Sequence, residues 1–514
     1  MKHSEVLIVL DFGAQYTQLI ARRVRELGVY SEIHRFDIPM SQLREKKPVG
    51  IILSGGPSSV YDADAPKPSP EVFQMGVPVL GICYGLQLIA DQLGGKVDPS
   101  ARREFGPAEV MIDNRDDLLA GLGTITTVWM SHGDALTQMP LEFESIAHSA
   151  NAPICAIRNV RKKIFGVQFH PEVVHTPEGK KILGNFVFGV CRASGGWSAQ
   201  SFVEEVTRDI RASVKSSHVL CALSGGVDSS VLAVLLHHAI GGQLHCIHIN
   251  NGLMRKHESE SVVRTFREQF HIKLSSVDAS TLFLSKLAGV TDPEQKRKII
   301  GKTFIEVFEK ESQKLLGEVE FLAQGTLYPD VIESASFNGP SVTIKTHHNV
   351  GGLPKDMKFK LIEPFRELFK DEVRAIGAKL DVPRELIGRH PFPGPGLAVR
   401  VLGEITEAKL NLLREADDIF IQELKHANLY DEIWQAFAVL LPVQSVGVMG
   451  DGRTYDFTLA LRAVTSVDGM TADWARVPHE ILARISNRIT NELRGINRVV
   501  YDVSSKPPAT IEWE

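Results

Sequence analysis

Short, uniformly apolar runs that end in glycine-containing turns recur in the first part of the chain. Val6–Leu10, Val49–Leu53 and Val77–Ile82 are such runs, as expected for strands buried on both faces. Tyr16–Gly28 lies between the first two and shows helical periodicity with a glycine stop. Strands that alternate with helices predict a mostly parallel sheet with helices on both faces. Ligand chemistry should then lie at the carboxyl ends of the strands.

The same alternation resumes after Ser194–Ser198, a segment with linker composition. His218–Leu223 and Leu244–Ile249 are expected to be strands, with a helix over Ser229–Ala239 between them. From about residue 397 the chain mixes helical and β-like runs. We therefore predict an α/β protein with two doubly wound, mostly parallel-sheet domains at 1–195 and 196–390, followed by a small α+β domain at 391–514.

Length and composition fit this division. A chain of 514 residues is too long for one core, since domains average roughly 150 residues. The net charge of −5 gives no general reason to expect a nucleic-acid or membrane partner. Five cysteines without a CxxC pair favour reduced thiols over a disulfide framework. No signal peptide or spanning segment is evident, so we expect a cytoplasmic protein.

Cys83 occupies a potential nucleophile position. The segment Gly81–Gly85 follows an apolar strand and precedes a helix, with glycines two residues before and after the cysteine. This is the pattern of a nucleophile elbow. The amide of Tyr84 should point to a developing oxyanion, and Gly55 and Gly56, at the end of an earlier strand, are candidates for a second donor.

A thiol near neutral pH needs a base, and His170 is the candidate. In an extended chain His170 and Glu172 point the same way, so the carboxylate can orient the imidazole. The sequence predicts a triad of Cys83, His170 and Glu172. The four other cysteines lie in apolar runs and are expected to be buried.

Four motifs together resemble the class I glutamine amidotransferases: Asp11–Tyr16, Ser54–Pro57, Gly81–Gly85 and Phe169–Glu172. The resemblance implies that Cys83 attacks the glutamine side-chain amide, forms a glutamyl thioester and releases ammonia. It also implies that Gln87 lies beside the glutamine. His132 lies in a loop motif of this family, and either a structural or a catalytic role is open.

A second glycine-rich turn joins the strand at His218–Leu223 to the following helix. Its glycines and helix N-terminus suit a phosphate, and the lysine of a Walker motif is absent. The segment resembles the pyrophosphatase loop of the N-type ATP pyrophosphatases, which cleave ATP between the α- and β-phosphates. The resemblance implies ATP-binding residues Ser224, Gly225, Gly226, Val227, Asp228, Ser229 and Ser230.

Such a reaction uses Mg²⁺ with ATP. Asp228, Asp330 and Glu333 are the candidate metal ligands, although Asp228 could instead organise the loop. Asp330 and Glu333 could equally be an ordinary pair of carboxylates at a helix start. Asn250 stands where many pyrophosphatase relatives carry aspartate, so an ionic role at that position is in doubt.

The combination of both segments in one chain resembles the family of GMP synthetases over essentially all residues. The resemblance implies that XMP, ATP and glutamine are the substrates and that adenylyl-XMP is an intermediate. It implies that the third domain mediates a homodimer. Residues matching the XMP-binding positions of this family are Arg297, Gln435, Lys506 and Glu512.

Three other functions would fit parts of the sequence. One is amidation of a different adenylylated acceptor, as in NAD synthesis, for which the glutaminase type does not match. The second is tRNA modification, because pyrophosphatase loops also serve RNA thiolation; zinc or paired-cysteine motifs and a basic surface would favour it, and the sequence shows neither. The third is a regulatory protein with an inactive glutaminase domain, which the complete triad disfavours.

Overall fold

The computed structural model describes residues 5–14, 16–315, 319–335, 359–449, 452–466, 469 and 471–514. The chain divides into two compact units. Unit 1 comprises Met1–Phe202 with Pro329–His347, and unit 2 comprises Val203–Tyr328 with His348–Glu514. The boundaries fall within helix α5 (Ala199–Val214) and at the start of helix α10 (Tyr328–Ala335). The domain boundary expected near residue 390 lies inside unit 2 and stays a prediction.

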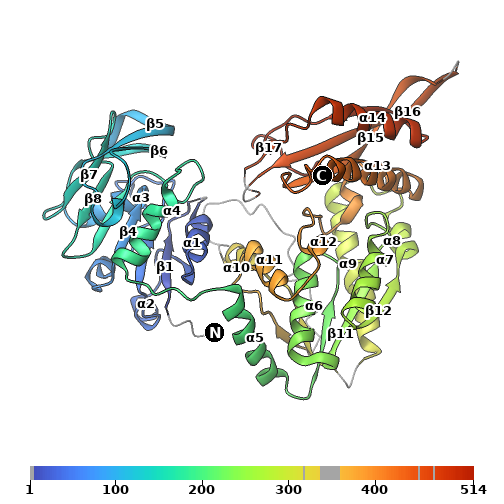
Figure 1. Cartoon of the computed structure of the whole chain (residues 1–514), viewed down its shortest axis with the longest axis horizontal. Helices are drawn as coiled ribbons and strands as arrows, with labels where there is room; N and C mark the ends of the chain where they lie inside the picture. The colour runs from blue at the N-terminus through green and yellow to red at the C-terminus, as the bar shows by residue number, and fades with distance from the viewer. Residues whose placement is uncertain are drawn as a thin grey trace. The chain divides into compact units, whose positions relative to one another are not determined.

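Unit 1 is built on a nine-stranded sheet (Figure 1). Its first five strands in sheet order pair in parallel, and three of them carry the apolar runs expected from the sequence; the remaining four pair antiparallel. In sheet order the strands are β2 (Ser31–Arg35), β1 (Leu7–Asp11), β3 (Gly50–Leu53), β4 (Val79–Ile82), β9 (Ile164–Val167), β8 (Ala156–Asn159), β7 (Glu144–Ser149), β5 (Lys96–Ile112) and β6 (Ile125–Gln138).

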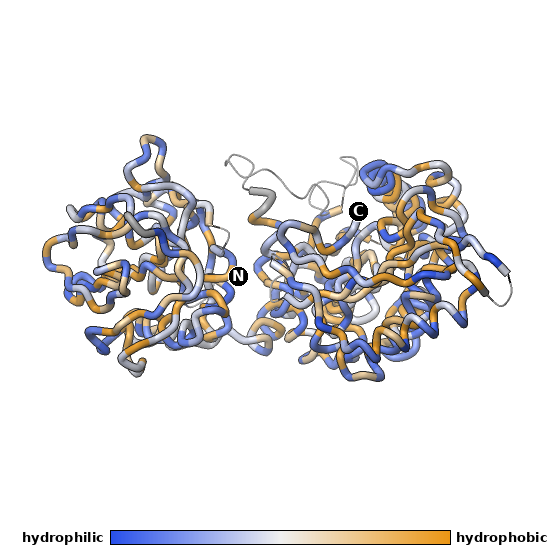
Figure 2. Tube along the Cα trace, turned by 90° about the horizontal axis from the view of Figure 1, so that it is seen from above, coloured by the Kyte–Doolittle hydropathy of each residue, from blue (hydrophilic) through white to orange (hydrophobic). Residues whose placement is uncertain are grey.

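The helices of unit 1 pack on this sheet through their apolar faces. In α1 the buried positions include Ile20, Ala21 and Val24, at the spacing of one helical face. The alternation of hydrophobic and hydrophilic residues is visible along the tube in Figure 2. The helices are α1 (Thr17–Glu26), α2 (Met40–Glu45), α3 (Tyr84–Gln92) and α4 (Gly179–Gly184), with 3-10 turns at Pro70–Gln74 and Asp117–Leu119 and a π-helical segment at Asn185–Val190.

Unit 2 contains a five-stranded, wholly parallel sheet, as the sequence predicts. In order, its strands are β12 (Lys273–Asp278), β11 (Leu244–Asn250), β10 (His218–Ala222), β13 (Val319–Ala323) and β14 (Lys360–Ile362). The surrounding helices are α6 (Val227–Ile240), α7 (Glu258–Arg264), α8 (Ser280–Leu287), α9 (Pro293–Gln313), α11 (Lys370–Lys379) and α12 (Arg384–Ile387). Helix α6 is apolar on most faces and buried, which fits its central place.

The C-terminal part of unit 2 is an α+β layer, as expected. Helices α13 (Glu407–His426) and α14 (His479–Glu492) accompany a sheet of β15 (Gln435–Met449), β16 (Gly452–Thr465), β17 (Asp473–Trp474) and β18 (Ile496–Tyr501). One hydrophobic core runs through the whole unit and includes Leu220 of β10, Leu397, Phe420 of α13 and Leu461 of β16. The two sheets of unit 2 therefore share their buried interior.

No helix in the described part of the chain has the length and apolarity needed to cross a bilayer. All five cysteines are free. Cys155, Cys221 and Cys246 are buried as expected, whereas Cys191 is only partly buried. The segment 345–354, part of the resemblance, and the side chain of Glu333 lie outside the described residues.

Candidate active sites

Cys83 sits on a sharp turn between β4 and α3, and its backbone has φ 52° and ψ −105°, a conformation costly for a non-glycine residue. The flanking glycines make the turn possible. A Cβ on Gly81 would lie 2.4 Å from the carbonyl oxygen of Gly85, and one on Gly85 would lie 2.4 Å from that of Leu53. Helix α3 begins at Tyr84, about two residues earlier than the sequence suggested. The turn is thus a nucleophile elbow.

Three sequence-predicted residues meet around the thiol. A Cβ built on Gly55 would lie 3.2 Å from Cε1 of His170 and 3.8 Å from Cβ of Cys83. The Cys83 sulfur lies 3.6 Å from the carbonyl oxygen of Ser131 and 3.7 Å from Nε2 of Gln168. Ser131 and Gln168 were not predicted as neighbours, since Ser131 lies within β6 and Gln168 follows β9. A side chain at position 55 would therefore be in tight contact with the His170 ring.

His170 and Glu172 form a buried pair, with Nδ1 2.7 Å from Oε1. The other carboxyl oxygen of Glu172 is buried and has no hydrogen-bond partner in the described structure. Burial opposes the charged ring, but the Glu172 carboxylate and hydrogen bonds with Cys83 and Glu172 outweigh it and raise the pKa of His170 well above its ordinary value. An imidazolium beside the thiol favours the thiolate, which is the nucleophilic form.

Two backbone segments near Cys83 can supply oxyanion donors. The hydroxyl of Ser54 donates to the carbonyl oxygen of Gly55 at 2.8 Å, so the amide of Gly56 points the opposite way across that trans peptide. Tyr84 is the first residue of α3, where amides have no partner within the helix. Gly56 packs tightly, since an added Cβ would lie 3.1 Å from the Tyr84 ring.

Gln87 and His132 bind the same carbonyl group. Nε2 of Gln87 donates to the carbonyl oxygen of Asp134 at 3.3 Å, and Nδ1 of His132 lies 2.9 Å from it. Nε2 of His132 lies 3.0 Å from Oε2 of Glu104, and both side chains are buried. The geometry therefore favours the structural alternative for His132: it holds the part of β6 that carries Ser131 against the cysteine, and the expected loop motif lies within this strand.

The second predicted site lies between β10 and α6. Gly225 has φ +84°, which favours glycine. The Ser224 hydroxyl lies 2.9 Å from that of Ser229 and accepts the Gly226 amide at 3.2 Å. Gly226 is the N-cap of α6 and makes no side-chain cap bond, so the first amides at Val227 onward face outward at a helix N-terminus. The hydroxyl of Ser230 is buried without a described partner.

Of the three predicted metal ligands, Asp228, in the first turn of α6, is the one for which the surroundings of both carboxyl oxygens are described. Its Oδ1 is buried with no hydrogen-bond partner among the described residues, and Oδ2 lies 3.4 Å from Nζ of Lys370. The described residues hold no cluster of three or more potential metal-binding side chains. Mg²⁺ beside nucleotide phosphates commonly uses one or two carboxylates, so Asp228 fits that need. Asp330 lies in the first turn of α10.

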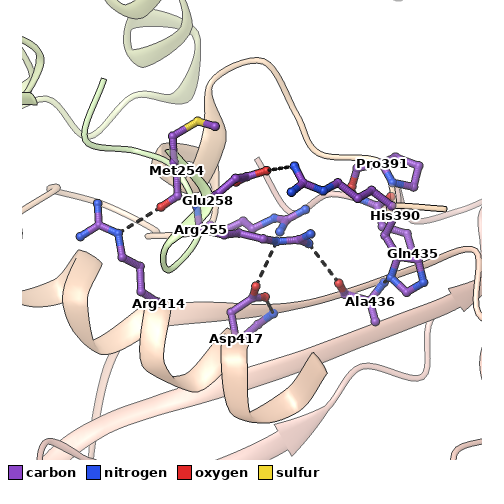
Figure 3. A network of polar contacts seen from close by, with 12 residues as sticks. Met254, Arg255, Glu258, His390, Pro391, Arg414, Asp417, Gln435 and Ala436 are labelled. Carbon is purple, nitrogen blue, oxygen red and sulfur yellow. Dashed lines mark hydrogen bonds and ion pairs between the residues drawn. The ribbon is translucent and has the colours of Figure 1, made fainter. Parts of the chain in front are cut away.

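Two of the four predicted XMP residues bind each other. Nε2 of Gln435 donates to Oε1 of Glu512 at 2.6 Å and to the carbonyl oxygen of Pro391 at 3.2 Å (Figure 3 shows Gln435 beside Pro391). Arg297 donates to the main-chain oxygen of Glu514 at 2.6 Å, and Nζ of Lys506 donates to that of Gly469 at 2.8 Å. Arg297, Gln435 and Glu512 thus belong to one polar region around the last residues, and Lys506 is held separately.

Two buried cations that the sequence did not reveal bind the carboxylates of the last three residues. Arg400 is fully buried and binds both carboxyl oxygens of Glu512, with its guanidinium 4.1 Å from the Phe437 ring centre. Lys296, also fully buried, lies 2.7 Å from Oε2 of Glu514. These pairs are 112 and 218 residues apart in sequence, so no local pattern could reveal them. Asn250 accepts the Gly252 amide through Oδ1 at 3.0 Å, a neutral turn contact.

Three family comparisons match separate parts of the chain. Residues 8–190 match the glutamine amidotransferase class-I family, residues 217–284 match the tRNA methyl transferase HUP domain, and residues 422–513 match the GMP synthase C terminal domain. The first match contains Cys83, His170 and Glu172, and the second contains the loop Ser224–Ser230. The third contains Gln435, Lys506 and Glu512.

Curated relatives match over the full chain. The glutamine-hydrolysing GMP synthase of Brachyspira hyodysenteriae is 59% identical over 99% of both chains. That of Aquifex aeolicus is also 59% identical over 99% of both chains. That of Desulfotalea psychrophila is 58% identical over 100% of this chain and 99% of its own.

Proposed function

Because this chain belongs to the family of glutamine-hydrolysing GMP synthases, we propose that it makes GMP from XMP, ATP and glutamine at two separate centres. The products are GMP, AMP, pyrophosphate and glutamate, with one water consumed. The observation that carries the proposal is the sequence identity of 58–59% to these carbon–nitrogen ligases over 99–100% of the chain. The same chain also contains a cysteine elbow and a pyrophosphatase-type loop.

At the first centre the Cys83 thiolate attacks the side-chain amide carbon of glutamine. The resulting oxyanion is stabilised by backbone amides at the end of β3 and at Tyr84. His170 gives its proton to the leaving ammonia, and a glutamyl thioester remains on Cys83. Water, deprotonated by His170, then attacks the thioester and releases glutamate. Glu172 holds the imidazole in position through both steps.

At the second centre the 2-oxygen of XMP attacks the α-phosphorus of ATP, and pyrophosphate leaves. The loop Ser224–Ser230 has hydroxyls and a helix N-terminus suited to hold the departing phosphates. Magnesium, when bound with ATP, offsets the phosphate charge, and Asp228 is the described residue suited to hold it. Ammonia then attacks carbon 2 and AMP leaves, which gives GMP.

Arg297, Gln435, Lys506 and Glu512 form the proposed XMP site. Two cations suit the nucleotide phosphate, and an amide with a carboxylate suits the polar edges of base and ribose. Arg400 is not itself proposed to contact XMP. Its two hydrogen bonds to Glu512 orient that carboxylate.

The protein is further proposed to act as a cytoplasmic homodimer, with no nucleic-acid partner. Support for the dimer comes from the β15–β16 ribbon, which exposes large apolar side chains. Val443, Val446, Val448 and Tyr455 are 56%, 46%, 77% and 57% exposed. A second copy could cover this surface, as unpaired apolar patches favour association.

The proposal is tested by incubating the purified protein with XMP, ATP, Mg²⁺ and glutamine and identifying the products, with parallel reactions that lack XMP or replace glutamine by ammonium. GMP with equimolar AMP and pyrophosphate is expected. ATP cleavage without GMP would indicate another acceptor. Folded protein that shows no XMP-dependent ATP cleavage with either nitrogen source would overturn the proposal and reopen the tRNA-modification alternative.

A further inference from the structure

The two carbonyl groups on either side of Ser224 in the pyrophosphatase-type loop are both bound by side chains from elsewhere in unit 2. Nδ1 of His248, on β11, lies 2.8 Å from the carbonyl oxygen of Leu223. Nη1 of Arg389 donates to the carbonyl oxygen of Gly225 at 3.0 Å. Arg389 is 164 residues from Gly225 in sequence, so the loop is held by a distant segment.

Both side chains are in turn anchored on the first residues of α7. Nε2 of His248 lies 2.5 Å from the Ser259 hydroxyl. Because a carbonyl oxygen only accepts, Nδ1 carries the proton and Nε2 accepts from Ser259; burial lowers the pKa of His248, in keeping with this neutral form. Nη1 of Arg389 lies 3.1 Å from Oε1 of Glu258 (the dashed contact of Glu258 in Figure 3).

Helix α7 also touches the loop directly. A Cβ on Gly225 would lie 2.5 Å from Cγ2 of Val262, so only glycine leaves room for this helix. Three residues of α7 therefore support the Leu223–Ser224 and Gly225–Gly226 peptides: positions 258 and 259 through Arg389 and His248, and position 262 by direct packing on Gly225.

These contacts fix which way the loop amides point. The only cis peptides in the described structure are at Pro507 and Pro508, so the loop peptides are trans. In a trans peptide the N–H points opposite to the C=O. With the carbonyls of Leu223 and Gly225 bound on the α7 side, the amides of Ser224 and Gly226 are turned to the other side, and the Gly226 amide reaches the Ser224 hydroxyl there.

We infer that Arg389, held by Glu258, is a positioning residue for ATP: it orients the Gly225–Gly226 peptide so that the loop donors face the nucleotide phosphates. The inference rests on the proposed ATP-binding role of the loop. It assigns a task to the proline- and glycine-rich segment that starts at Arg389, and that task is distinct from XMP recognition.

The side chain of Arg389 is 22% exposed, so a direct contact with a phosphate is the competing explanation. The two explanations differ at Glu258. A carboxylate that merely sits near a phosphate site repels the ligand, and its neutralisation improves or leaves unchanged the binding of ATP. A carboxylate that fixes Arg389 weakens ATP binding when it is neutralised.

The experiment measures the Kd of Mg·ATP by calorimetry and XMP-dependent pyrophosphate release in the full-length protein. Arg389→Met is expected to raise the Kd about tenfold or more, since charge-assisted hydrogen bonds contribute at that scale. Glu258→Gln is expected to raise it about threefold, and the double variant no more than Arg389→Met alone, because the two act as one unit. The KM for XMP stays within about twofold. Arg389→Lys should recover part of the loss.

Arg384→Met is the matched control, because Arg384 makes a similar 2.8 Å ion pair with Asp431 in the same unit but is 82% exposed. It should leave the Kd unchanged. An unchanged Kd in Arg389→Met, tighter or unchanged binding in Glu258→Gln, or an equal loss for ATP and XMP with a lowered melting temperature would each overturn the inference. A wild-type protein that binds Mg·ATP but releases no pyrophosphate with XMP would contradict the proposed function and leave the positioning result standing.

Discussion

Cys83 is held by its own backbone and by close packing, whereas the loop Ser224–Ser230 is held by side chains from distant segments. The cysteine turn needs glycine at two flanking positions, where an added Cβ would meet backbone oxygens at 2.4 Å. The loop depends on Arg389, which reaches it from 164 residues away and is fixed by Glu258. The cysteine turn is thus shaped mainly by the packing of its own glycines, and the Gly225–Gly226 peptide of the loop by an ion pair from a distant segment. The two centres should therefore respond differently to substitution.

Among the residues that support the nucleophile or the loop, the largest effect is expected at the pair His170 and Glu172. Glu172→Gln removes the charge that favours the imidazolium of His170, so glutamine hydrolysis should fall about 10²- to 10⁴-fold. Because the pKa of His170 is raised in the native protein and falls in the variant, the alkaline limb of the pH–rate profile should move to lower pH. The check is glutamate release measured across pH; an unshifted alkaline limb would contradict the role of Glu172.

The second prediction concerns Gly81→Ala, which disrupts the close packing of the turn that carries Cys83. The added methyl group would meet the carbonyl oxygen of Gly85, and the displaced nucleophile should lower kcat/KM for glutamine about 10²-fold. Ammonium-dependent GMP synthesis should be retained. Gly189→Ala is the matched control, since no heavy atom lies within 4 Å of its added Cβ. Similar losses in both variants would show that packing at the elbow has no special importance.

Arg400→Met removes the ion pair between Arg400 and Glu512 in unit 2. Glu512 then keeps Gln435 as partner but loses both guanidinium hydrogen bonds, so the KM for XMP should rise about tenfold. Steady-state kinetics with varied XMP measures this. Glutamine hydrolysis measured without nucleotides should stay normal, and Arg384→Met should behave as wild type. A KM for XMP like that of the wild type would mean that Arg400 does not position Glu512.

The smallest effect is expected at Lys370, whose ammonium lies 3.4 Å from Asp228 and whose side chain is 46% exposed. Exposed ion pairs contribute less than about 1 kcal/mol, so Lys370→Ala should change the KM for ATP by no more than about fivefold. An effect on ATP binding as large as that of Arg389→Met would show that the exposed Lys370 matters as much to the loop as the less exposed Arg389. The special role given to Arg389 would then be lost.

The difference between local motifs and contacts across a long stretch of sequence explains what the sequence could predict. The elbow, the His170–Glu172 spacing and the loop Ser224–Ser230 are local patterns, each interpretable from a few neighbouring residues, and their fold context is confirmed. The antiparallel strands β8, β7, β5 and β6 were not foreseen, because strand runs alone do not encode pairing direction. Arg400 and Lys296 escaped notice because ion pairs across more than a hundred residues leave no periodic signal.

The division of labour between two centres is tested most directly by Cys83→Ala, assayed for GMP formation with glutamine and, separately, with ammonium. Cys83 is required only for release of ammonia, so glutamine-dependent synthesis should fall below about one thousandth of wild type while ammonium-dependent synthesis is unchanged. Equal loss of both activities in a folded variant would contradict the account, because it would place Cys83 in the chemistry of XMP as well.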